Sequence, residues 1–344
     1  MARRATSCNV VSAPLDLLNR YPLKCVKRER TSAKLLEERR RREAGKIVEY
    51  KALVDKVLTA RKNHDYTPGA LSLTTTLLKQ NPEYYTVWNY RREILSSIFQ
   101  TQTADAIQSQ IDNELQFLFA RLIEFPKCYW IWNHRKWCLQ SSPSPSWKFE
   151  LGLVTKMLDR DARNFHGWHY RRYVVQCTEK ATGKSMVRPE FDYTTTKINA
   201  NFSNFSAWHN RTKLIPRLLK EEPEIDARKL LANEIYLITQ AIYTDPDDQS
   251  VWLYHRWLIT SDDIVKLSSD ERKDLLEKEI KSIQELLEVE PDSKWCLQSL
   301  AFYKGLLATL AGGRVESSVH GYLDKLQEID PMRQKRYEDW KKQL

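Results

Sequence analysis

Five residues in the middle of the chain have the chemistry needed to hold an anion. Lys127 and Arg163 are cations, while Tyr129, Asn164 and His166 can donate hydrogen bonds. They fall in two similar phrases, FPKCYWIW and DARNFHGW. Cations beside helix starts and hydrogen-bond donors suit a group such as a diphosphate. Solvated charge at helix ends is the alternative explanation.

Two of these residues depart from a pattern that recurs along the chain, and such departures favour function over packing. The other phrases of the pattern place Thr86, Trp130, Ser206 or Ser250 where His166 stands, and Glu83, Arg163, Ser203 or Asp247 where Lys127 stands.

Other catalytic chemistry is not indicated by the sequence. It contains no glycine-rich phosphate loop, GxSxG or HExxH, and no DxD metal pair in a helical pattern. His166 and His169 have the spacing of a metal pair. However, histidines recur beside the tryptophans (His134, His169, His209), which favours a structural role for His169. For Asp247 and Asp248 we expect helix capping, and we expect no metal on this chain.

The elements that position these residues are repeats marked by tryptophan. Successive tryptophans are separated by 44, 36, 40, 44 and 43 residues, a period typical of stacked-repeat folds. The sixth unit is shorter by two residues, and a seventh places Tyr337 six residues after Pro331. The six tryptophans are Trp88, Trp132, Trp168, Trp208, Trp252 and Trp295.

Each phrase predicts the start of a helix. Asn-Pro or Asp-Pro ends the preceding helix, and residues such as Glu83, Ser203, Asp247 and Asp292 suit the first turn. An arginine three or four residues after the tryptophan shares its helix face. Segments 111–125 and 228–243 also have helical apolar spacing. Each repeat is therefore a helix pair, and the tryptophans are predicted core residues.

We expect two parts in the chain. Residues 1–30 are predicted to be irregular, and residues 31–344 to form a helical-repeat domain. That domain begins with a basic helix over about 31–62, capped by Thr31 or Ser32, in which Arg39–Arg42 form a solvated face. The repeats follow over about 67–342. The longest exposed loops are expected at 141–146 and 178–189, which are rich in serine, glycine and proline.

Composition excludes several classes of protein. Of the net charge of +10, residues 1–46 carry +8 (13 Lys or Arg against five Asp or Glu). The repeats are therefore almost neutral, which argues against nucleic-acid binding. No apolar run reaches the ~20 residues of a membrane span. Six cysteines without a CxxC pair suggest reduced thiols in a cytoplasmic protein.

The repeated phrase N/D-P-x-x-Y-x-x-W-x-x-R-R resembles the protein prenyltransferase alpha-subunit repeat over about residues 67–300. Within that family, NFSNFSAWHNR, DPDDQSVWLYHRWL and EPDSKWCL are similar to the Rab geranylgeranyltransferase (type II) branch. The resemblance implies an all-α, right-handed crescent or solenoid of about six to seven helical hairpins, wrapped around a separate beta subunit. That beta subunit would hold the catalytic zinc and the isoprenoid, so this chain would bind no cofactor itself.

The resemblance also implies roles for the residues above. Lys127, Tyr129 and His166 would be catalytic and lie near the lipid diphosphate. Asn164 would lie beside His166, and we assign Asn164 and Arg163 to substrate binding. The family tyrosine before the histidine is Phe165 here, which removes one hydroxyl.

The function expected from the resemblance is transfer of geranylgeranyl from its diphosphate to C-terminal cysteines of Rab GTPases. An escort protein would present the Rab, and the chain would be active only with its beta subunit. Two alternatives stay open at this point: the alpha subunit shared by farnesyltransferase and geranylgeranyltransferase type I, and a helical-repeat scaffold without catalytic function.

Overall fold

The computed structural model describes residues 33–344, and every regular element in that range is helical. The chain is thus an all-α helical-repeat solenoid, as its periodicity predicted. The predicted irregular segment 1–30 and the predicted caps Thr31 and Ser32 lie outside the described residues. The described helices divide between two compact units, and the division along the sequence falls after Ala181. None of these helices is long and apolar enough to cross a membrane.

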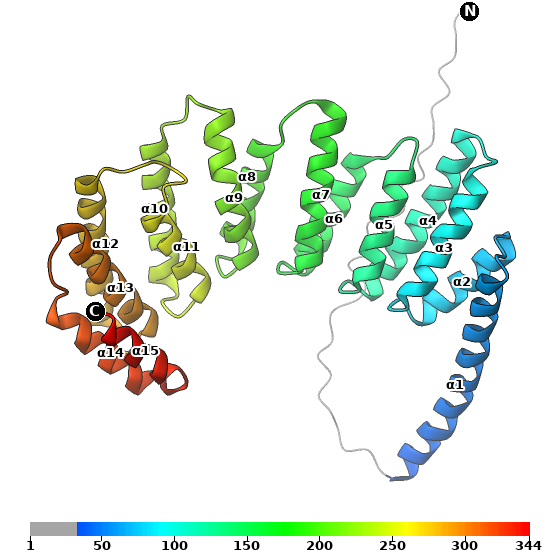
Figure 1. The fold of residues 1–344 in the computed structure, drawn as a ribbon, viewed down its shortest axis with the longest axis horizontal. Helices are drawn as coiled ribbons and strands as arrows, with labels where there is room; N and C mark the ends of the chain where they lie inside the picture. Colours follow the sequence, from blue (N-terminus) through cyan, green and yellow to red (C-terminus); the bar gives the residue numbers. More distant parts are fainter. Residues whose placement is uncertain (1–32) are drawn as a thin grey trace, which may run out of the picture. The chain divides into compact units, whose positions relative to one another are not determined.

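The first unit consists of a long helix followed by three helical hairpins, coloured blue to green in Figure 1. The hairpins pair α2 with α3, α4 with α5, and α6 with α7. Its helices are α1 (Ala33–Lys62), α2 (Pro68–Gln80), α3 (Tyr85–Phe99), α4 (Ala104–Glu124), α5 (Tyr129–Ser141), α6 (Trp147–Arg160) and α7 (Phe165–Thr182).

The second unit contains four further hairpins. The pairs are α8 with α9, α10 with α11, α12 with α13, and α14 with α15. They are α8 (Val187–Ala200), α9 (Phe205–Glu221), α10 (Ala227–Thr244), α11 (Gln249–Thr260), α12 (Ser269–Val289), α13 (Lys294–Ala311), α14 (Ser317–Ile329) and α15 (Gln334–Lys342), with the 3-10 turn η2 (Pro331–Arg333) before α15.

Five of the six tryptophans are core residues held by the same hydrogen bond. In each case the indole Nε1 donates to the carbonyl oxygen six residues earlier, over 2.6–2.9 Å. This bond replaces the hydrogen bond that the indole N–H would make with water, so it offsets the cost of burying that group in the core. The five are Trp88, Trp132, Trp168, Trp208 and Trp252, each at most 3% exposed.

The sixth tryptophan is the exception. Trp295 is only partly buried, and its Nε1 has no hydrogen-bond partner. Leu297, six residues after Pro291, occupies the buried position instead. The two-residue shift seen in the sequence thus changes which side chain enters the core. In the seventh unit Tyr337 takes the tryptophan position as predicted: it is fully buried and donates to Asp330 over 2.8 Å.

Helix capping differs from the prediction by one residue. The Asn or Asp that opens a phrase closes a turn, whether or not a proline follows it: Asn81, Asn201 and Asp245 each accept a bond from the amide two residues later. The predicted caps Glu83, Ser203, Asp247 and Asp292 therefore lie inside turns. The side chains that cap the helices follow one residue later and are Asn204, Asp248 and Ser293.

Buried ion pairs join successive helices. In several repeats the arginine three residues after the tryptophan pairs with a glutamate on the next helix in sequence. Arg135 with Glu150 is an example, both side chains being 1% exposed. A buried charge is tolerated only when it is paired and hydrogen-bonded, so these pairs fix how successive helices meet. Arg91 with Glu114 and Arg211 with Glu234 are further examples.

One further sequence expectation needs correction. The loop predicted for 178–189 is only 183–186, because α7 continues to Thr182 and Pro189 lies in the first turn of α8, where proline is tolerated. In α1 the apolar side chains described are buried only near the end of the helix. Val57 is 1% exposed, whereas Leu35 and Ile47 are more than half exposed.

Candidate functional site

The predicted site residues lie at the starts of two helices of the first unit. Lys127 belongs to the turn before α5, and Tyr129 is the first residue of α5. Arg163 belongs to the equivalent turn before α7, where Asn164 precedes the helix and His166 is its second residue.

Asn164 connects the two helix starts. Its Nδ2 donates to the carbonyl oxygen of Pro126 over 3.0 Å, and its Oδ1 accepts from the amides of His166 and Gly167. The side chain is 3% exposed. Both polar atoms of the Asn164 side chain are therefore hydrogen-bonded to the backbone. These bonds hold His166 in position.

His166 lies against Tyr129 across the two repeats. The ring centroids are 5.8 Å apart with the planes inclined at 56°. Burial lowers the pKa of His166 below 6.5, although a hydrogen bond to the backbone of Lys127 and the charge of Glu83 act in the opposite direction. The imidazole therefore supplies no net charge to this edge at neutral pH, and its N–H serves the Lys127 backbone.

Lys127 supplies the charge at this edge. Its Nζ lies 3.4 Å from Oδ2 of Asp161, the residue that follows α6, and its side chain is 71% exposed. An exposed ion pair of this kind is worth only about 0–1 kcal/mol. Lys127 can therefore exchange Asp161 for a more highly charged anion at little cost.

The side chain of Arg163 makes no hydrogen bond or ion pair with the other four residues. It is exposed, and within residues 33–344 it has neither an ion pair nor a side-chain hydrogen bond. The structure therefore brings Lys127, Tyr129, Asn164 and His166 together, as the stacking of repeats predicted, and leaves Arg163 beside them in solvent.

The helix amides expected to face the anion differ between the two helices. The first amides of α7 are taken by Asn164. The start of α5 has no side-chain cap, so its amides are the ones available to an anion.

Sequence inspection missed a continuous row of aromatic rings through this site. Tyr85 packs on Trp130 at 5.1 Å, Trp130 on Tyr129 at 5.2 Å, and His166 on Phe165 at 4.0 Å between centroids. Tyr85, Tyr129 and Phe165 are 51–68% exposed. We call these five rings the aromatic row. The signal was present in the sequence, because an aromatic residue stands three positions before four successive tryptophans.

Two cations on the same helices have no carboxylate partner. Arg92 contacts Asn89 and His134, and Lys136 lies over the ring of Tyr173. Both are half-buried, and burial lowers the pKa of each. The preceding residues on the same helices, Arg91 and Arg135, pair with buried glutamates. Arg92 and Lys136 make no ion pair within residues 33–344.

The comparisons with known proteins decide the family. The protein prenyltransferase alpha subunit repeat matches residues 68–98, 111–142, 147–178, 187–218 and 231–262. Geranylgeranyl transferase type-2 subunit alpha of Schizosaccharomyces pombe is 45% identical over 88% of this chain and 94% of its own length. The protein of the same name from Saccharomyces cerevisiae is 39% identical over 91% and 97%. The chain belongs to the geranylgeranyl transferase type-2 alpha-subunit family.

This membership makes the chain a subunit of a prenyltransferase enzyme, and it disfavours both the farnesyltransferase-type subunit and the scaffold. The mouse member of the same name is 35% identical over 67% of this chain, but that match covers only 40% of the mouse protein. The fold has a solved counterpart in Candida albicans protein geranylgeranyltransferase-I complexed with GGPP. The TM-score is 0.63, with 20% identity and 92% coverage of each chain.

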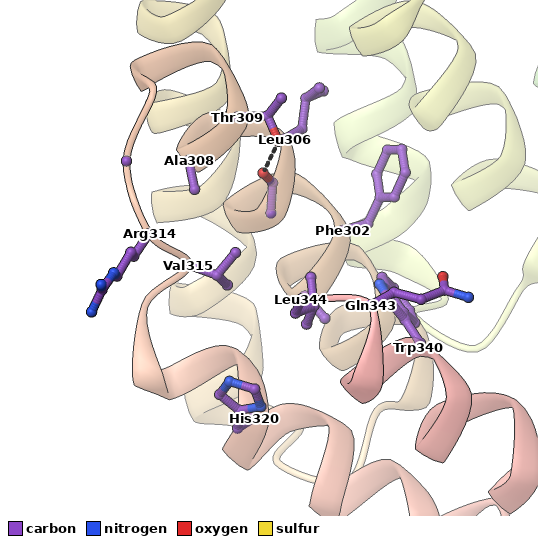
Figure 2. A pocket seen from close by; sticks show the side chains of 13 residues that line it. Phe302, Leu306, Ala308, Thr309, Arg314, Val315, His320, Trp340, Gln343 and Leu344 are labelled. Atoms are coloured by element: carbon purple, nitrogen blue, oxygen red, sulfur yellow. Dashed lines mark hydrogen bonds between the residues drawn. The ribbon is translucent and has the colours of Figure 1, made fainter.

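A hollow lies in the second unit, and none of the five predicted site residues lines it. It has a volume of about 720 Å³ and is bounded by α13, α14 and the C-terminal residues. Figure 2 shows Phe302, Val315, Trp340 and Leu344 around it. Nor do three His, Cys, Asp or Glu side chains gather as a metal site anywhere in residues 33–344.

Proposed function

We propose that this chain pairs with a beta subunit in the cytoplasm and that the pair transfers geranylgeranyl from its diphosphate to C-terminal cysteines of Rab GTPases presented by an escort protein. The observation that carries the proposal is the 45% identity over 88% of the chain to a type-2 alpha subunit. The grouping of Lys127, Tyr129 and His166 at one edge supports a contact with the diphosphate there.

The aromatic row and the unpaired cations support docking of a beta subunit on α3, α5 and α7. Exposed aromatic residues that line up across repeats are unfavourable in a free monomer, and aromatic residues and arginine are enriched at protein interfaces. Arg92 and Lys136 are partly desolvated and make no ion pair within residues 33–344. A partner with acidic side chains over these positions would compensate both cations.

Lys127 is the residue proposed to act on the reaction rate. When the bond from the isoprenoid to its diphosphate breaks, negative charge grows on the departing oxygen. A cation held beside that oxygen stabilises the transition state more than the ground state. The exposed side chain of Lys127 can reach such a group by leaving Asp161.

Tyr129 and His166 are proposed to orient the diphosphate. The Tyr129 hydroxyl makes no hydrogen bond within residues 33–344, so it is free to donate. The amide of His166 is held by Asn164, and its imidazole lies against the ring of Tyr129. Arg163 contributes long-range attraction from solvent, since it touches none of the other four.

We assign the zinc of the enzyme to the beta subunit. A bound zinc ion would supply a thiolate from the acceptor cysteine, because it lowers the pKa of a coordinating thiol. The described part of this chain offers no ligand cluster for it.

Co-expression with a candidate beta subunit tests the assembly. We expect the purified pair to transfer geranylgeranyl to a Rab bound to escort protein, and the chain alone to be inactive. A matched pair of variants tests the docking face: Arg92→Glu with Lys136→Glu should prevent co-purification, whereas Arg41→Glu on exposed α1 should not. Turnover by the chain alone, or normal co-purification of the double variant, would contradict the proposal.

A further inference from the structure

The side chain of Asp161 differs from those that open the equivalent turns of other repeats. Asn81, Asn201 and Asp245 each accept a hydrogen bond from the amide two residues later, over 3.0–3.1 Å. The carboxylate of Asp161 accepts no hydrogen bond within residues 33–344. The backbone does not explain this difference, because the carbonyl oxygen of Asp161 closes its turn over 3.1 Å, as that of Asn201 does. Only the side chain departs from the repeated pattern.

The carboxylate of Asp161 pairs instead with a cation of the neighbouring repeat. Its Oδ2 lies 3.4 Å from Nζ of Lys127, and the Asp161 side chain is 22% exposed, against 71% for Lys127. Arg163 is only two residues from Asp161, yet Arg163 forms no ion pair within residues 33–344. The partner of Asp161 is therefore the cation proposed to contact the diphosphate, and not the cation nearest to it in sequence.

A carboxylate and a diphosphate are alternative partners for one ammonium group. An exposed ion pair contributes little to stability, so it can be exchanged, and a more highly charged anion attracts the ammonium group more strongly. A bound diphosphate therefore displaces the carboxylate of Asp161. That carboxylate remains attached close by at the end of α6, and it pairs with Lys127 again when the diphosphate leaves.

From this arrangement we propose that Asp161 is a positioning residue that competes with the diphosphate for Lys127. It holds the ammonium group at the edge of α5 and α7 when no diphosphate is bound. It also weakens the binding of the diphosphate, in the substrate and in the released product alike. The inference rests on the proposed function, because it requires that Lys127 contacts the diphosphate.

Binding to the reconstituted pair of subunits tests the competition. Asp161→Asn removes the charge, and asparagine already closes the equivalent turns at Asn81 and Asn201, so the variant should fold. We expect the Kd for geranylgeranyl diphosphate and the inhibition constant of inorganic diphosphate to fall by about two- to fivefold, as the strength of one exposed ion pair implies. Asp245→Asn removes the same charge from the same turn position and should leave both constants unchanged.

A double variant separates competition for Lys127 from simple charge repulsion. In the Lys127→Ala background, Asp161→Asn should change neither constant further, because no ammonium group remains to be shared. A carboxylate that only repels the diphosphate would instead give the same fall in both backgrounds. Urea unfolding of each variant, with Asp161→Asn no less stable than wild type, establishes that the effect is not a loss of structure.

The inference is overturned if Asp161→Asn binds with wild-type or weaker affinity while Lys127→Ala slows transfer, or if the fall in both constants persists in the Lys127→Ala background. Wild-type rate and affinity in Lys127→Ala would refute the proposed role of Lys127 itself, and the competition with it.

Discussion

Asn164 donates from its side-chain amide to the carbonyl oxygen of Pro126 over 3.0 Å, and this bond ties the start of α7 to the start of α5. The same carbonyl accepts from the indole of Trp132 over 2.9 Å. The preceding repeat has an equivalent arrangement, in which the carbonyl of Pro82 accepts from Trp88 and from the thiol of Cys128. The proline carbonyl of each of these two phrases thus accepts one hydrogen bond from its own repeat and one from the next repeat.

Asn164→Ala should therefore damage both stability and the site. It removes a helix cap, worth about 0.5–2 kcal/mol, and the bond to Pro126, and it frees the amides that place His166. Urea unfolding of the purified chain measures the loss. Asn113→Ala, on the exposed face of α4, is the matched control and should stay within about 0.5 kcal/mol of wild type. Equal urea midpoints for Asn164→Ala and Asn113→Ala would show that the Asn164 side chain does not connect the two helix starts.

The tryptophans should divide into two classes. Trp168→Ala should lower the free energy of unfolding by about 3–5 kcal/mol, because removal of a buried aromatic ring leaves a cavity. Trp295→Ala should cost less than half as much, since that ring is only partly buried and its N–H is unpaired. Thermal melting compares them directly. A Trp168→Ala melting curve within a degree or two of wild type would show that this ring is not core.

The periodicity made much of this fold predictable, because the first five tryptophans share one hydrogen bond and one buried position. The helix pairs, the buried tryptophans and Tyr337 follow from that regularity. Trp295 was mispredicted as core because the sixth unit is two residues short after its proline, and the buried position moves to Leu297. The number of residues between the start of the turn and the side chain decides which side chain is buried, whatever its residue type.

The buried glutamates could have been found but were not. Glu114 stands in the apolar spacing of Ile111 and Leu118, and Glu234 stands in that of Leu231 and Ile238. An acid within an apolar stripe requires a buried cation, and the arginine of each phrase provides one. The loop at 178–189 was overestimated because Pro189 was taken as a helix breaker, whereas it lies in a first helical turn.

The candidate site was predictable in its composition but not in its details. Departure from the repeat template identified Lys127 and His166, and the stacking of repeats placed them together. The pairing of Lys127 with Asp161, the commitment of the Asn164 amide to the fold and the isolation of Arg163 depend on side-chain geometry. Repeat spacing contains no information on these three features.

Stability should fall as the pH is lowered, in two ranges. Burial lowers the pKa of His134 below 6.5, so its neutral form stabilises the fold and that contribution is lost below about pH 6.5. Burial acts to raise the pKa of Glu114, but the charge of Arg91 and hydrogen bonds from His134 and Arg91 outweigh it and lower the pKa from 4.5 to about 2. That contribution is present above pH 4.5 and is lost as the pH falls toward 2.

Thermal melting between pH 8 and pH 3 measures both ranges. His134→Gln should flatten the dependence between pH 7 and pH 5. His64→Asn, which alters an exposed histidine, should leave the slope unchanged. A wild-type midpoint that stays constant from pH 7 to pH 5 would contradict the assignment of a buried neutral His134.

The most direct test of the proposed diphosphate site is single-turnover transfer by the reconstituted pair of subunits. We predict that Lys127→Ala lowers the rate of the chemical step by about tenfold to 10³-fold, with a smaller change in the Kd for geranylgeranyl diphosphate, and that Arg163→Ala changes the rate far less. If both variants react at the wild-type rate, the diphosphate does not lie at this edge of α5 and α7, and the account is wrong.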